Sequence, residues 1–347
     1  MKPLNILFLS HRFYPFTGGI EVNSEILATE FYKRGHNVKL ITWTREKGNK
    51  DFSFTVIRNP SFAELWSTHR WADVVFENNP CYRLSWPLHF TPSRSVVAIR
   101  TLIKRSNGEI AFQDKLKFKH LNRADRVIAV SSAIRNACWP DATVIPNPYR
   151  NSLFRIIPEI DKNKDFVFLG RMVSQKRCDL NIKLLAKLKE SHPEKANLTV
   201  VGDGPEDENL KNMVNDLGLK ENVNFVGEMK GEELVRELNK YRYILIPSDF
   251  EAFGNVALEG IACGCLPIVS DSGGLVDAIG DAGLSFKSSN LDSFYQTTTS
   301  LLENPDLEET IRSKAQEHLS IHEPDKIAGR YLDVIESAFN SNNKNSA

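Results

Sequence analysis

The first half of the chain repeats one pattern: a short apolar run, a loop, and then an amphipathic stretch. Residues 4–10 are mostly apolar, which is typical of a parallel strand buried on both faces. Residues 20–34 place Val22, Ile26, Leu27 and Phe31 on one face of a predicted helix that ends at Gly35. Further strands are predicted at residues 38–43, 73–76, 95–99, 126–130 and 143–145, and helices near residues 113–122 and from residue 131.

Residues 146–165 interrupt this pattern with three prolines and a polar stretch. The pattern then restarts, with strands predicted at residues 166–169, 198–201, 223–226, 243–246 and 266–269 and helices at residues 179–190, 206–217, 232–240 and 255–263. Strands that alternate with helices indicate right-handed βαβ crossovers and a parallel sheet. We therefore predict an α/β protein with two Rossmann-like, doubly wound parallel-sheet domains that face each other across a cleft.

The domain boundaries follow from the same pattern. Residues 1–150 form the first predicted domain and residues 151–322 the second. Residues 323–347 contain a last predicted helix, near residues 324–339, followed by a polar tail. The sequence does not show whether this helix returns to the first domain. We expect the two domains to close about residues 146–165.

Composition narrows the class of protein. With 41% apolar and 25% charged residues, the chain is neither disordered nor collagen-like. No apolar run approaches the roughly 18 residues of a membrane span, and residues 4–9 lack the flanks of a signal peptide. The five cysteines are scattered and form no CxxC motif, so neither a disulfide framework nor a zinc site is predicted. We expect a cytoplasmic protein.

The net charge of zero conceals an asymmetry between the two halves. Residues 1–150 contain 22 Lys and Arg against 12 Asp and Glu, whereas residues 151–347 contain 22 against 32, which gives +10 and −10. Either the two domains attract each other, or the first half meets an anionic partner such as a phosphate-bearing substrate or the inner face of a membrane. Nucleic acid is not expected, because the basic run at residues 115–126 has no interleaved stacking aromatics beyond Phe118.

Two short motifs follow predicted strands and suit phosphate binding. Gly18 and Gly19 precede the first helix, where glycine lets a ligand approach the backbone and the free N–H groups attract an anion. Gly170 and Arg171 follow the strand at residues 166–169, with Lys176 on the same loop. A guanidinium and an ammonium on one loop suit a diphosphate. Each motif is weak alone, since paired glycines and surface cations are also common in ordinary turns.

The most informative stretch is residues 248–260, directly after the strand that ends near Ile246. If the helix begins near Asn255, Glu251 lies on the loop and Glu259 on the second helical turn. Carboxylates accept hydrogen bonds from sugar hydroxyls. The backbone N–H groups of Phe253, Gly254 and Asn255 would then face a phosphate. The alternative is a structural one, with Glu251 as an N-terminal helix charge and Glu259 on a solvated face.

Together these motifs resemble the retaining glycosyltransferases of the GT-B fold, family-4 type, known as glycosyl transferases group 1. The resemblance covers nearly the whole chain, and it includes residues 124–131, 144–148 and 202–205. It implies that Arg171 and Lys176 hold the diphosphate of a nucleotide-sugar donor and stabilise it as it leaves. It also implies that Gly18 and Gly19 complete the phosphate site, that Glu259 contacts the ribose, and that Glu251 contacts the donor sugar. Family members need neither a metal nor a cofactor.

The chain departs from the family in one respect. Many members carry a histidine after the third or fourth strand of the first domain, near the donor sugar. Here Asn78 and Arg100 are the nearest positional substitutes, and His11 could reach the cleft instead. Two other patterns are decoys: residues 249–251 superficially resemble an acidic metal motif, and His318 with His322 are expected to be a surface pair on a terminal helix. Residues 227–229 are a faint candidate for the nucleobase pocket.

The sequence therefore predicts a metal-independent retaining hexosyltransferase. Its catalytic candidates are Glu251, Arg171 and Lys176, and its acceptor is expected to be a glycan or a lipid-linked molecule used in cell-surface polysaccharide or glycolipid assembly. Three alternatives remain open: a GT-B epimerase or phosphorylase, a catalytically silent nucleotide-sugar-binding subunit, and a nucleic-acid-binding protein. Product analysis, donor hydrolysis and salt-dependent binding distinguish them.

Overall fold

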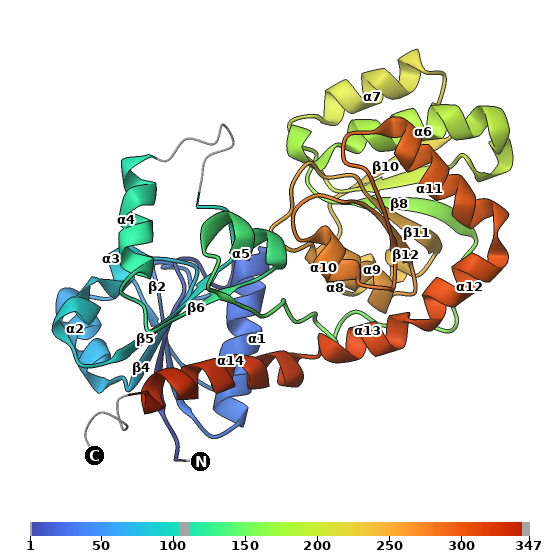
Figure 1. The fold of residues 1–347 in the computed structure, drawn as a ribbon. Helices are drawn as coiled ribbons and strands as arrows, with labels where there is room; N and C mark the ends of the chain where they lie inside the picture. The colour runs from blue at the N-terminus through green and yellow to red at the C-terminus, as the bar shows by residue number, and fades with distance from the viewer. Residues whose placement is uncertain (1, 104–110, 342–347) are drawn as a thin grey trace. The chain divides into compact units, whose positions relative to one another are not determined.

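The structure is a computed structural model that describes residues 2–103 and 111–341. Most of the predicted polar tail lies outside the described residues. The chain divides into two compact units (Figure 1). The first unit contains Met1–Pro148 together with Glu323–Ala347, and the second contains Tyr149–His322.

The first unit is built on a seven-stranded sheet with the order β3-β2-β1-β4-β5-β6-β7. All pairings in it are parallel, so every strand ends at the same edge. Its strands are β1 (Asn5–Leu9), β2 (Asn37–Thr42), β3 (Thr55–Arg58), β4 (Val74–Asn78), β5 (Arg94–Ile99), β6 (Arg126–Ala129) and β7 (Thr143–Val144). Its helices are α1 (Gly19–Lys33), α2 (Phe62–Trp71), α3 (Tyr82–Ser85), the 3-10 helix η1 (Trp86–Phe90), α4 (Phe112–Leu121), α5 (Ser132–Cys138) and α14 (Pro324–Asn340).

The last helix belongs to the first unit although it comes last in the chain. α14 packs beside α1 and against β4 and β5 (Figure 1). Its apolar face carries Ile327, Tyr331 and Ile335, all fully buried in the core under β1, β4 and β5. The Tyr331 ring stands edge-on to Phe76 of β4, with the ring centroids 5.6 Å apart. The first unit is therefore completed by residues that are distant in sequence.

The second unit has a six-stranded parallel sheet with the order β10-β9-β8-β11-β12-β13. Its strands are β8 (Lys164–Leu169), β9 (Leu198–Val201), β10 (Val223–Gly227), β11 (Tyr241–Ile246), β12 (Leu266–Ser270) and β13 (Leu284–Phe286). Its helices are η2 (Ser174–Lys176), α6 (Cys178–Ser191), η3 (Pro193–Lys195), α7 (Asp207–Asp216), α8 (Gly231–Leu238), α9 (Asn255–Ala262), α10 (Leu275–Ile279), α11 (Leu291–Glu303), α12 (Pro305–Ser313) and α13 (Ala315–Ile321).

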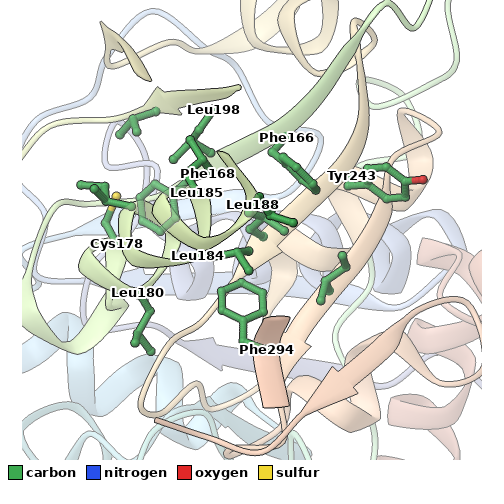
Figure 2. Packing of buried hydrophobic residues seen from close by; sticks show 14 of the residues in the cluster. Phe166, Phe168, Cys178, Leu180, Leu184, Leu185, Leu188, Leu198, Tyr243 and Phe294 are labelled. Atoms are coloured by element: carbon green, nitrogen blue, oxygen red, sulfur yellow. The ribbon is translucent and has the colours of Figure 1, made fainter. Parts of the chain in front are cut away.

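Helices on both faces bury this second sheet. On one face, Leu184, Leu185 and Leu188 of α6 pack toward Phe166 and Phe168 of β8 (Figure 2). Phe294 of α11 closes the same core and stacks on Phe286, with the ring centroids 4.0 Å apart. Since both faces are covered, the strands carry continuous apolar runs, which explains why the sequence revealed them.

Some elements have no strong sequence signal. The prediction omits β3, a short edge strand whose four residues are exposed or half-buried, and it omits β13, which has only three residues. It also omits α2, although a capping box begins that helix: the Ser61 side chain accepts a hydrogen bond from the Glu64 N–H, and Glu64 accepts from the Ser61 N–H.

Within residues 2–103 and 111–341, no helix combines the length and the apolar character needed to cross a bilayer.

Candidate functional site

Four loops meet at the carboxyl edge of the second sheet. They follow β8, β9, β11 and β12, which are neighbours in that sheet. Main-chain hydrogen bonds join them: Met172 N donates to Asp203 O at 2.7 Å, Asp249 N to Gln175 O at 2.9 Å, and Gly274 N to Glu251 O at 2.8 Å. The topology thus brings residues 170–177, 202–205, 247–254 and 271–274 into one cluster.

Glycines allow this close approach of backbone to backbone. Gly202 has φ +137°, and a Cβ there would lie 2.0 Å from the carbonyl oxygen of Gly170. Gly273 has φ +65°, and a Cβ there would lie 2.1 Å from the carbonyl oxygen of Glu251. Only glycine fits either position. Gly273 was missed at the sequence level, although the paired glycines after β12 were the available signal.

The two predicted cations lie on the loop between β8 and α6. The Arg171 side chain is exposed, and among the described residues it has neither a hydrogen-bond nor an ion-pair partner. Lys176 ends the 3-10 helix η2 and forms an ion pair with Glu251, whose carboxylate also accepts a hydrogen bond from Ser248 Oγ at 3.2 Å. The Lys176 and Glu251 side chains retain 28% and 19% exposure, so a ligand can still reach both.

Arg177, which the sequence analysis did not select, fixes the shape of this loop. It adopts a left-handed conformation with φ 52°, and its guanidinium binds Asp179 at 3.0 Å and Asp249 at 2.9 Å. Asp249 also accepts from Ser289 Oγ at 3.1 Å. The Asp249 carboxylate, which is part of the acidic motif at residues 249–251, is therefore bound by Arg177 and Ser289. Across residues 2–103 and 111–341, no group of three or more His, Cys, Asp and Glu side chains is arranged to hold a metal ion.

The loop after β11 leads directly into α9. Gly254 caps this helix with φ +114°, and Asn255 is its first residue. Phe253 is buried, and its ring lies 5.7 Å from the ring of His322. The prediction that His318 and His322 form a surface pair is wrong. Both are buried, because α13 packs against α9, and the ring of His318 hydrogen-bonds the Ala278 carbonyl of α10 at 2.7 Å.

Glu259 lies on the second turn of α9 with its side chain 18% exposed. Burial raises the pKa of this carboxyl to about 7, and the nearby Arg150 opposes the rise only weakly, since its Nη2 lies 3.8 Å from Glu259 Oε1. Arg150 was missed at the sequence level because it precedes the first strand of this unit. Glu259 is therefore largely shielded from solvent, whereas the structural alternative placed it on a solvated face of the helix.

We expect Glu259→Gln to raise the free energy of unfolding at pH 8 and to leave it almost unchanged at pH 4. The folded-state pKa of about 7 exceeds the ordinary 4.5, so stability falls as the pH rises from 4.5 to 7. The full penalty above pH 7 is about 3 kcal/mol. Urea unfolding followed by circular dichroism at several pH values measures the difference. Glu221→Gln, at an exposed glutamate, should show no such trend. A pH-independent gain in Glu259→Gln would contradict the assignment.

In the first unit, Gly18 caps α1 and Gly19 begins it, and both are exposed. His11 is exposed too, with Nδ1 3.6 Å from Cys81 Sγ, and partial burial together with Arg12 and Arg83 lowers its pKa. Thus the loop after β1 presents an imidazole and two glycines at the carboxyl edge of the first sheet.

Asn78 and Arg100 are buried instead, at 1% and 5% exposure. Arg100 Nε donates to Asn78 Oδ1 at 2.6 Å, and its Nη1 donates to Asn147 Oδ1 at 2.7 Å. The guanidinium also lies over the Tyr331 ring, 5.2 Å from the centroid. These contacts connect β4, β5, residue 147 and α14. As sugar-side candidates the two residues are thus poorly placed, since the core of the first unit covers them.

Comparison with known proteins agrees with this architecture. Residues 150–318 match the family described as glycosyl transferases group 1. The GPI3 subunit of phosphatidylinositol N-acetylglucosaminyltransferase from Saccharomyces cerevisiae is 24% identical, over 95% of this chain and 80% of the yeast protein. Anabaena HepE, solved in complex with UDP-glucose, superposes with a TM-score of 0.78 at 19% identity, covering 96% of this chain and all of that one. A glycosyltransferase from Rickettsia africae gives 0.79 at 17% identity, covering 98% of this chain and all of that one.

Proposed function

We propose that this GT-B glycosyltransferase, whose residues 150–318 belong to the family of glycosyl transferases group 1, moves a hexose from a nucleoside diphosphate sugar to an acceptor hydroxyl. The second unit binds the donor. The transfer retains the configuration at the anomeric carbon, and neither a metal nor another cofactor takes part.

The observation that carries this proposal is the ion pair of Lys176 with Glu251 on the strand-end loops, just before the first turn of α9, with Arg171 on the same loop as Lys176. Two cations and a helix N-terminus suit the two phosphates of the donor. The Glu259 carboxylate lies one further turn along the same helix, where it accepts hydrogen bonds from ribose hydroxyls. The solved HepE complex, which contains UDP-glucose, supports a nucleotide-sugar ligand for this fold.

The proposed mechanism is electrostatic. Cleavage of the anomeric C–O bond leaves negative charge on the departing diphosphate, which Arg171 and Lys176 stabilise. Lys176 is paired with Glu251 in this structure, so donor binding at the ammonium would exchange its partner. The diphosphate takes the ammonium, and the carboxylate becomes free to accept from a hydroxyl of the donor sugar. The leaving phosphate then accepts the proton of the acceptor hydroxyl on the same face, so retention needs no covalent nucleophile.

The acceptor side of the proposal rests on charge. The first 150 residues carry a formal charge of +10, which favours an anionic acceptor or an acceptor displayed on an anionic membrane. The yeast relative, by its name, acts on a phosphatidylinositol. We therefore propose a lipid-linked or phosphorylated glycan as the acceptor, at the inner face of a membrane.

A panel of nucleoside diphosphates and their sugars tests the donor. The correct donor should raise the melting temperature, since a ligand at 100 times its dissociation constant stabilises by about 2.7 kcal/mol. Donor hydrolysis should then proceed in EDTA, and NMR of the transfer product should show the anomeric configuration of the donor. No stabilisation by any nucleotide would overturn the proposal.

A second candidate is a catalytically silent nucleotide-sugar-binding subunit, since the yeast relative is named as a subunit. In that case the same nucleotides stabilise the protein, but the purified chain neither hydrolyses nor transfers the sugar. Measuring turnover alongside the thermal shift separates the two functions.

A further inference from the structure

Five aromatic side chains form a surface on the first unit, which we call the aromatic surface: Phe62, Trp66, Tyr82, Trp86 and Phe90. Phe62 and Phe90 are 70% and 69% exposed, and Tyr82 is 50% exposed. Soluble proteins expose single apolar side chains commonly, but a contiguous group of large ones marks a binding surface. Nothing in the proposed chemistry uses these residues.

The aromatic surface is an ordered structure. Phe62 lies against both indoles, with centroids 6.5 Å from Trp66 and 5.4 Å from Trp86, and the indole centroids are 6.2 Å apart. Phe90 lies 6.2 Å from Trp66 and 6.3 Å from Trp86. Trp66 and Trp86 are half-buried, so they anchor the group in the protein, while Phe62 and Phe90 remain exposed to solvent.

Buried residues hold the segments that carry these rings. Glu77, fully buried at the end of β4, contacts His120 of α4 at 2.5 Å and accepts from the Cys81 N–H at 2.9 Å, directly before α3. The carboxylate raises the pKa of His120 although burial, the largest single influence, lowers it. The His120 ring stands edge-on to Tyr82 at 6.0 Å. This pair therefore ties α3 to α4 under the aromatic surface.

Cations surround the aromatic surface. Arg123, directly after α4, contacts the His89 ring of η1 at 3.1 Å, and Arg83 is exposed on α3. α4 adds the exposed Lys115 and Lys119 together with Leu116, which is 41% exposed. Figure 1 shows α2, α3 and α4 following one another along one side of the first unit. The exposed carboxylate on α2, Glu64, is occupied by the capping box with Ser61.

We infer that the aromatic surface docks onto the interface of an anionic lipid bilayer, with Phe62 and Phe90 entering the headgroup region and the cations of α3 and α4 contacting lipid phosphates. Amphipathic indole and phenol rings favour that interface, and lysine and arginine complement its charge. The two outermost rings are phenylalanines without polar atoms, which suits a lipid more than a hydrated polymer. This inference deepens the proposed membrane acceptor, since it names the surface that meets the membrane.

Vesicles test the inference without donor or acceptor. The protein should bind phosphatidylcholine vesicles that contain phosphatidylglycerol, and binding should weaken with salt. Phe62→Ser with Phe90→Ser should weaken binding about thirtyfold. Lys115→Gln with Lys119→Gln should weaken it about twentyfold on anionic vesicles and leave the weak binding to phosphatidylcholine unchanged. Tyr32→Ser, at a residue 44% exposed on α1, is the matched control and should bind normally.

Depth can be measured through the tryptophans. Brominated phosphatidylcholine in the same vesicles should quench the fluorescence of Trp66 and Trp86, and Trp66→Phe with Trp86→Phe should lose most of the quenching. Unchanged vesicle binding in the serine double variant would overturn the inference. Two other results would also overturn it if the protein failed to bind vesicles. One is dimerisation that depends on Phe62 and Phe90, and the other is binding of a single-stranded oligonucleotide that depends on them. Nucleotide stabilisation should be normal in all three double variants, which separates this test from that of the donor site.

Discussion

Lys176→Ala should lower kcat for sugar transfer by about a thousandfold in a protein that remains folded. The ammonium is one of two side-chain cations proposed to stabilise the leaving diphosphate, and removing one such donor from a preorganised site typically costs 10² to 10³ in rate, about 2.7 to 4 kcal/mol. The effect should reach the upper end, because the variant also leaves the negative Glu251 carboxylate near the diphosphate with no ammonium to offset its charge. Steady-state kinetics with the donor identified by thermal shift measures it.

Two variants make this test specific. Lys183→Ala removes a lysine of the same unit that is paired with Asp179 on α6, and it should transfer sugar normally. Lys176→Arg keeps the charge and should recover part of the loss, though not all, because the guanidinium has a different reach. If Lys176→Ala turned over at a near-normal rate while folded, the proposed donor site would be wrong.

Glu251→Gln tests the exchange of partners. The Glu251 carboxylate holds Lys176, so removing its charge releases the ammonium for phosphate. The variant should bind the nucleoside diphosphate several-fold more tightly than the native protein. It should still transfer the sugar more slowly, since a neutral amide accepts a hydrogen bond from the sugar hydroxyl more weakly than a carboxylate does. Isothermal titration with the diphosphate, beside the kinetics, distinguishes the two effects. If Glu251→Gln weakened the binding of the diphosphate and of the nucleotide sugar equally, the role of Glu251 would be purely structural.

The strands most accessible to prediction are those buried on both faces. β1, β8 and β11 contain continuous apolar runs because helices cover both faces of each sheet, so a local pattern reports the fold. The edge strand β3 lacks that pattern, since its residues are exposed or half-buried. The parallel order also predicts that loops after neighbouring strands meet. Sequence alone therefore placed Lys176 and Glu251 on strand-end loops.

The partners of those residues could not be predicted. The pair of Lys176 and Glu251 spans 75 positions and depends on β8 lying next to β11 in the sheet, which the pattern of one chain does not state. The aromatic surface combines residues of α2, α3 and η1. The sequence pattern does not show which of these elements lie next to each other, so it could not predict this surface. His318 and His322 looked like a surface pair because four-residue spacing does not tell which face of a helix is covered.

Arg100 is a further residue whose contacts with distant parts of the chain could not be predicted from the sequence. Its place after a strand of the first sheet made it a candidate for the sugar side, but α14, from the other end of the chain, covers it. The burial lowers its pKa, and among the described residues its Nη2 has no hydrogen-bond partner. The guanidinium holds Asn78 and Asn147 together, so its role in the structure is to connect segments of the first unit.

We therefore expect Arg100→Ala to lower the free energy of unfolding of the first unit by about 3 kcal/mol. The variant loses two charge-assisted hydrogen bonds and the contact with the Tyr331 ring, and it leaves a cavity. Relief from burying an unpaired cation offsets part of the loss, which keeps the figure below the sum of those contributions. All five tryptophans lie in the first unit, so urea unfolding followed by tryptophan fluorescence reports on this unit alone.

Arg94→Ala, at the start of the strand that Arg100 follows, provides the matched control. Arg94 begins β5 and pairs with Asp125 at 3.0 Å, but both side chains are more than 20% exposed, so its removal should cost less than about 1 kcal/mol. Nucleoside diphosphate binding to the second unit should be unchanged in both variants at a temperature where they remain folded. An Arg100→Ala protein of native stability that failed to transfer sugar would instead place this guanidinium on a ligand, because a structural role predicts loss of stability before any loss of chemistry.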